Sequence, residues 1–164
     1  MEPTRVCFED KFEQVVSLIP VYTDGHQRAT EVHLTGGKVL LDRRRMRGVL
    51  EALAHDIPTA SLSRLRSQAR KILGRGRIVP LPYSRKLVLV PVRVRRPEFK
   101  DDGAYAYFNI HHFSRVEPWQ ADSYRSVITL DGGIQIKSMD RMRTVQMYVS
   151  DAHRLLNEYR PFRI

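Results

Sequence analysis

The chain has 164 residues, 42% of them hydrophobic, and 28 Lys and Arg stand against 18 Asp and Glu, which gives a net charge of +10. A chain of this length can bury one ordinary core, so we expect one domain or two closely packed halves. No apolar run reaches about eighteen residues, and MEPTRVCFED lacks the basic-then-apolar order of a signal peptide. The single Cys7 excludes an internal disulfide. We therefore expect a soluble, cytoplasmic protein with no membrane partner.

The first part of the chain has the pattern of a strand followed by a hairpin. Residues 12–22 are predicted to form a strand that Pro20 bends or ends. A hairpin is expected from Thr30 around Gly36-Gly37. With a two-residue loop, one apolar face would hold Val32, Leu34, Val39 and Leu41.

A basic helix is predicted after this hairpin. Asp42 is placed to cap it, and the helix should end before Ile57-Pro58, because a residue that precedes proline is pushed out of the α region. Arg43 and Arg44 precede the apolar stripe, and cations in a first helical turn oppose the helix dipole, a cost that a nearby phosphate would remove. The apolar stripe comprises Met46, Val49, Leu50 and Leu53.

Residues 61–78, SLSRLRSQARKILGRGRI, are rich in cations and contain no acid. Ser67 and Gln68 place neutral hydrogen-bonding groups among these cations, a mixture suited to phosphate contact with limited contact to base edges. The apolar residues also fit a solvent-exposed basic helix, but six unneutralised cations repel one another, which favours a polyanionic partner. The predicted DNA-contacting residues are Arg43 and Arg44 before this stretch and, within it, Arg64, Arg66, Ser67, Gln68, Arg70, Lys71, Arg75 and Arg77.

The last third of the chain repeats the plan of the first. ITLDGGIQIKSMDRMRTV, residues 128–145, matches VHLTGGKVLLDRRRMRGV, residues 32–49, at seven positions, including Arg45/Arg141 and Arg47/Arg143. Residues 108–113, FNIHHF, are expected to form the strand before the second hairpin, whose loop of three residues would give it a different register. Ser138 is expected to cap the final helix.

The sequence therefore predicts a β-rich α+β fold in which two pseudo-repeated strand–hairpin–helix units pack as one compact protein. The predicted boundary divides residues 1–96, with the basic connector, from residues 97–164. At the end of the first half, the predicted strand at 86–96 contains Pro91, which indicates an edge or a bulge at that point.

No motif indicates an enzyme, a cofactor or a metal site. The phosphate-loop, HExxH and GxSxG patterns are all absent from the sequence. His111 and His112 are adjacent, so in a strand they would point to opposite faces, one buried and one in solvent, and could not easily hold one metal ion.

Three short motifs, LVLVP at 87–91, NIHHF at 109–113 and ITLDGG at 128–133, occur in an order that resembles the competence transcription factor family ComK. Each repeat is also similar to the core of a LytTR-type DNA-binding domain. By the second resemblance, residues 63–67 would be extended and would contact DNA. The chain departs from the ComK pattern in a run without glycine through Leu73 and in a short C-terminus.

The ComK resemblance implies a bacterial transcription activator of DNA-uptake genes that reads A·T-rich promoter boxes through the minor groove of double-stranded DNA. A narrow A·T minor groove is strongly negative and attracts arginine. The resemblance further implies a nucleoid-associated homo-oligomer, with possible control by a regulatory adaptor protein. The alternative is an RNA-binding or ribosome-associated basic protein, for which Tyr105, Tyr107 and Phe108 would offer stacking surfaces.

Overall fold

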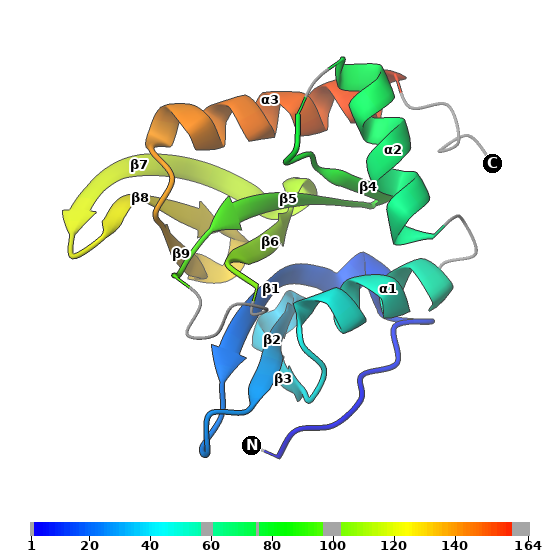
Figure 1. The fold of residues 1–164 in the computed structure, drawn as a ribbon, viewed down its shortest axis with the longest axis vertical. Helices are drawn as coiled ribbons and strands as arrows, with labels where there is room; N and C mark the ends of the chain where they lie inside the picture. The colour runs from blue at the N-terminus through cyan, green and yellow to red at the C-terminus, as the bar shows by residue number, and fades with distance from the viewer. Residues whose placement is uncertain (1, 57–60, 75, 97–102, 159–164) are drawn as a thin grey trace.

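A computed structural model describes residues 2–56, 61–74, 76–96 and 103–158. Within these ranges the protein has nine strands and three α-helices, and the strands form two antiparallel sheets (Figure 1). The predicted β-rich α+β class is confirmed. The proposed boundary at residues 96 and 97 adjoins residues 97–102, which lie outside the described part of the chain.

The larger sheet has six strands in the order β3-β2-β1-β6-β5-β4. Strand β6, from the second half of the chain, lies between β1 and β5, so this sheet draws on residues from both sides of the proposed boundary. Its strands are β1 (Val15–Tyr22), β2 (Arg28–Leu34), β3 (Val39–Asp42), β4 (Leu81–Ser84), β5 (Leu87–Arg93) and β6 (Tyr105–Asn109).

The smaller sheet has three strands in the order β7-β8-β9, and helix α3 packs on β7 and β8 as well as on β5 of the larger sheet. Helix α1 contacts β1 and β2, whereas α2 lies on the outermost strand, β4, and also contacts α3 (Figure 1). These elements are β7 (Phe113–Ala121), β8 (Tyr124–Leu130), β9 (Gln135–Ser138), α1 (Met46–Asp56), α2 (Leu62–Leu73) and α3 (Met142–Glu158).

The two predicted hairpins have the same register, so the expected difference between them is wrong. A single 3₁₀ turn closes each hairpin, at Thr35–Gly37 and at Asp131–Gly133. Gly36 and Gly132 have φ of 81° and 82°, a conformation that glycine adopts without steric cost. The longer turn shifts the first hairpin by one residue from the expected pairing. Val32 therefore lies opposite Leu40, and the predicted apolar face containing Val39 and Leu41 is also wrong.

The strand before each hairpin also begins in the same way. A 3₁₀ turn at Phe12–Gln14 leads into β1, and one at Ile110–His112 leads into β7. Residues 108–113 are therefore not one strand, because the Asn109 side chain accepts a hydrogen bond from the His111 N–H and starts the turn. The prediction that one histidine is buried is wrong too: His111 is exposed and His112 is half-buried beside Asp131.

Asp42 and Ser138 do not cap the helices, which begin four residues later, at Met46 and Met142. Instead each organises the junction before its helix: Asp42 Oδ1 accepts from Arg44 N at 2.9 Å, and Ser138 Oγ accepts from Asp140 N at 3.0 Å. Both side chains are completely buried. An additional segment docks on each junction, since Arg43 N donates to Thr4 O and Met139 N donates to Arg93 O.

The core has two main parts, which meet the two sides of the larger sheet. One lies under α1 and includes Leu50, Leu53, Phe8 and Tyr83. The other joins β5 and β6 to the smaller sheet and α3, through residues such as Phe108 and Ile128. The apolar stripe predicted for α1 is confirmed, because Met46, Val49, Leu50 and Leu53 are all buried.

The Asp42–Arg44 pair predicts a large effect on stability. Asp42 is fully buried, and its carboxylate accepts from Arg44 Nη2 at 2.7 Å and from Val6 N at 3.0 Å. Asp42→Asn should lower the free energy of unfolding by about 3 kcal/mol in urea titration, because a buried charge pair loses one partner. Glu51→Gln, which breaks the exposed Arg47–Glu51 pair, should cost no more than about 0.5 kcal/mol. Equal losses would contradict this assignment.

Replacing Asp140 should have the opposite effect to replacing Asp42, because it should stabilise the fold, and this effect should depend on pH. Burial raises the pKa of its carboxyl, against the hydrogen bond from Arg93 N and the charge of Arg93, which lower it. The folded protein therefore holds this proton more tightly than the unfolded chain, and the contribution of Asp140 to stability falls as pH rises through its raised pKa. Relative to wild type, Asp140→Asn should gain stability as the pH rises above about 4, the ordinary pKa of an aspartate, and through the raised pKa of Asp140. The exposed Asp122→Asn should show no such change, and a parallel response of both variants would refute the prediction.

Candidate nucleic-acid interface

The cation-rich stretch forms helix α2, so the expectation of an extended segment at 63–67 is wrong. Ser61 caps the helix by accepting a hydrogen bond from Arg64 N at 3.3 Å, and Gly74 ends it in the left-handed conformation. The apolar residues recur at helical spacing and turn one face inward. Leu62, Leu65, Ala69 and Leu73 are buried against the core below α1 and against Leu155 of α3.

The opposite face of α2 presents cations to solvent. Arg64, Ser67 and Lys71 are exposed at positions i, i+3 and i+7, so they lie along one stripe of the helix. Among the described residues, none of the ion pairs involves Arg64, Arg66, Arg70, Lys71 or Arg77. The described residues thus leave the cations of this stripe without a carboxylate partner, as the acid-free sequence indicated.

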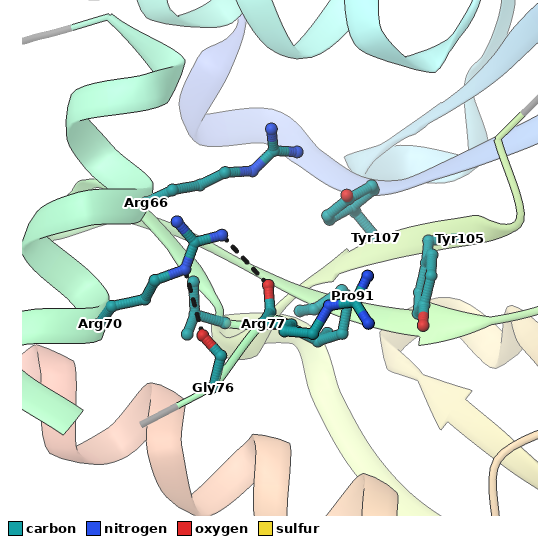
Figure 2. A pocket seen from close by; sticks show the side chains of 9 residues that line it. Arg66, Arg70, Gly76, Arg77, Pro91, Tyr105 and Tyr107 are labelled. Carbon is teal, nitrogen blue, oxygen red and sulfur yellow. Dashed lines mark hydrogen bonds between the residues drawn. The ribbon is translucent and has the colours of Figure 1, made fainter. Parts of the chain in front are cut away.

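Three further predicted residues of α2 are not part of that exposed stripe. Arg66 and Gln68 are half-buried, and Arg66 points from α2 toward Tyr107 (Figure 2). Arg70 is exposed, but its Nε donates to Gly76 O at 3.1 Å and its Nη2 donates to Arg77 O at 3.2 Å. Arg70 therefore fastens the segment after α2 back onto the helix.

The segment after α2 adds one exposed cation to this end of the molecule, Arg77. Gly76 has a φ of 99°, a conformation that favours glycine, and a Cβ there would make a tight contact of 3.2 Å with Ile78 O. The structure brings Arg66, Arg70 and Arg77 together around one cavity. Arg75, another predicted contact, lies outside the part of the chain that the structure describes.

The predicted Arg43 and Arg44 do not join the α2 surface. They precede the first residue of α1, whereas α2 follows its last, and the 11 residues of α1 separate them by about 16 Å along the helix. Arg43 is exposed, but the Arg44 guanidinium is bound by Asp42 and by Val6 O. This carboxylate raises the pKa of Arg44, chiefly through the hydrogen bond. Arg44 therefore anchors the N-terminal segment, and we omit it from the proposed interface.

Two basic hollows lie elsewhere, and Arg44 is the one predicted site residue among the described residues that line them. One is lined by Arg5, Arg44, Arg45 and Arg47, before and within the start of α1, and by Glu51, which pairs with Arg47. The other is lined by Trp119, Arg125, Arg141 and Arg143, where β7 approaches the start of α3. The sequence repeat held the signal for both, because it matches Arg45 with Arg141 and Arg47 with Arg143.

The aromatic residues of the RNA-binding alternative are poorly placed for stacking. Phe108 is completely buried and stacks on Phe113, with ring centroids 5.7 Å apart. Tyr107 is only 8% exposed, which leaves too little of its ring free to stack on a base. Tyr105 is half-buried and shares its cavity with Tyr107.

Across residues 2–158, wherever the structure describes them, no three His, Cys, Asp or Glu side chains come together as ligands for a metal ion. No helix in those ranges has the length and apolar character needed to cross a membrane. Comparison with family models, with curated proteins and with solved structures found no match for this chain.

The Arg70 contacts predict a local change on substitution. Arg70→Met removes two hydrogen bonds to the segment after α2, so that segment should open more often and trypsin should cleave after Arg77 about fivefold faster. Limited proteolysis with mass spectrometry measures the rate. Lys38→Met, at the opposite end of the six-stranded sheet, removes the same charge and should leave the rate unchanged. An Arg70→Met rate equal to wild type would show that these bonds do not hold the segment.

Proposed function

We propose that this protein binds double-stranded DNA as a transcription activator, with α2 as its principal contact. The observation that carries the proposal is the exposed stripe of Arg64, Ser67 and Lys71, whose cations have no carboxylate partner among the described residues. Cations that neutralise phosphates release condensed counterions, which supplies most of the affinity for a duplex. Ser67 adds a neutral hydrogen-bonding group between the two charges.

The proposal also specifies which groove of the DNA α2 approaches. An α-helix fits the major groove, whereas single arginine side chains enter the narrow minor groove of A·T tracts. The resemblance to ComK favours A·T-rich boxes in promoters of DNA-uptake genes, read through the minor groove. In that arrangement α2 lies along the phosphates and Arg64 extends between them.

Two such surfaces would be needed for specificity, because minor-groove contacts separate A·T from G·C pairs but little else. We therefore propose that the protein acts as a homo-oligomer on paired sites. The common register of the two hairpins and the shared position of Pro20 and Pro118, opposite Thr30 and Ser126, support two related LytTR-like units within the chain. The hollow containing Arg141 and Arg143 is then a second surface for the same duplex.

The double variant Arg64→Ala/Lys71→Ala tests the role of α2. It removes two phosphate contacts, so its affinity for an A·T-box duplex should fall about tenfold at fixed salt. Fluorescence anisotropy measures the affinity, and circular dichroism confirms the fold. Arg28→Ala/Lys38→Ala removes the same total charge at the β2–β3 edge of the larger sheet, opposite the strand β4 on which α2 lies, and should retain most of the affinity.

Competition experiments identify which nucleic acid the protein prefers and which groove it contacts. Unlabelled A·T-box duplex should compete better than G·C duplex or single-stranded RNA of equal length, and a minor-groove-binding drug should displace the protein. Equal competition by A·T and G·C duplexes would reject the A·T preference, and stronger competition by RNA would reject the DNA assignment. Equal losses in both double variants would remove α2 from the interface.

A further inference from the structure

A cavity of about 420 Å³ lies on the inner side of α2, between this helix, the segment at 76–79 and the part of β5 and β6 that β4 leaves unpaired (Figure 2). Its volume is within the range of small-molecule sites. The side chains that define it are Arg66, Arg70, Arg77, Pro91, Tyr105 and Tyr107.

The cavity exists because strand β4 is short. Its pairing with β5 ends at Leu89, so Pro91 has β6 on one side and no strand on the other. Pro91 has no N–H to donate, and therefore the open edge at this residue lacks a donor that another strand would need. The prediction of an edge at Pro91 is confirmed, and the space beside it remains open between the sheet and α2.

The charge of the cavity is positive. Three arginines line it, and none of the described residues around it is Asp or Glu. Arg70 uses two of its five N–H donors on Gly76 O and Arg77 O, which leaves three for another partner. Guanidinium groups crowded at a partly enclosed site repel one another more strongly than in water, and a bound anion would relieve this repulsion.

Two tyrosine hydroxyls complete a set of donors around the cavity. Burial raises the pKa of both Tyr105 and Tyr107, so the hydroxyls stay protonated at neutral pH and can donate to an anion. The charge of Arg66 and a hydrogen bond from its side chain act on the pKa of Tyr107 in the opposite direction. The tyrosine rings and Pro91 provide apolar surface beside these polar groups.

We propose that this cavity binds a small organic phosphomonoester. The phosphate would lie among Arg66, Arg70 and Arg77, where planar guanidinium groups match its oxygens, and the organic group would contact Pro91 and the Tyr105 ring. A phosphate of a DNA backbone has the same chemistry, but it belongs to a stiff duplex that is too wide to enter the cavity. Tyr107 is only 8% exposed, which places this donor deeper than a duplex surface reaches. The proposal does not depend on DNA binding by the outer face of α2.

Isothermal titration of the full chain with phenyl phosphate, in the absence of nucleic acid, tests the proposal. Binding should occur with a Kd of about 1 mM or tighter at physiological salt, and more tightly than inorganic phosphate, which lacks the organic group. Arg66→Met should weaken phenyl phosphate about tenfold, because a charge-assisted contact is lost. Lys38→Met, with the same loss of charge at the far edge of the sheet, should bind like wild type.

A second variant tests the same site independently, in case Arg66→Met does not fold. Tyr107→Phe keeps the ring but removes the donor, and it should weaken phenyl phosphate several-fold with an unchanged melting temperature. Absence of binding to wild type, or wild-type affinity in both variants, would overturn the proposal. A cavity that instead receives a DNA phosphate would overturn it too: phenyl phosphate would not bind, and Arg66→Met would weaken duplex binding as much as Arg64→Ala/Lys71→Ala. Loss of duplex binding alone would refute the proposed function and leave this site intact.

Discussion

Burial of the apolar stripe of α2 fixes the position of every cation on that helix. Leu62 and Leu65 pack in the core shared with α1, while Ala69 and Leu73 pack against Leu155 of α3. With that face held inward, the remaining side chains must point either along the sheet or into solvent. The exposed stripe and the arginine-lined cavity are therefore two consequences of the same packing.

Hydrogen bonds at the β–α junctions connect segments that are distant in the sequence. Two different segments, one at Thr4 and one at Arg93, accept a backbone hydrogen bond from equivalent positions just before α1 and α3. At the second junction, Asp140 and Ser138 both bond the backbone of Arg93, which connects the six-stranded sheet to the start of α3. Because α3 also packs on α2, this junction contributes to the position of the proposed DNA-binding face.

Local chemistry explains which features the sequence could predict. The spacing of Leu50 and Leu53, the break before Pro58 and the acid-free composition of α2 all depend on neighbours within a few residues. The hairpin register depends on whether the loop is a three-residue 3₁₀ turn or a two-residue turn. Two consecutive glycines are compatible with both, so the sequence does not decide between them. The role of Asp42 depends on Val6, and the cavity depends on Tyr105 and Tyr107, 35 or more positions from Arg70. Such contacts follow from tertiary packing, which residue periodicity does not encode.

The salt dependence of duplex binding tests the central claim most directly. If exposed cations of α2 and the nearby segment neutralise backbone phosphates, log K should fall linearly with log[salt], with a slope of about −3 or steeper for an A·T-box duplex. Arg64→Ala/Lys71→Ala should reduce the magnitude of that slope by about 2. A slope near zero, or a slope that this double variant leaves unchanged, would contradict the account.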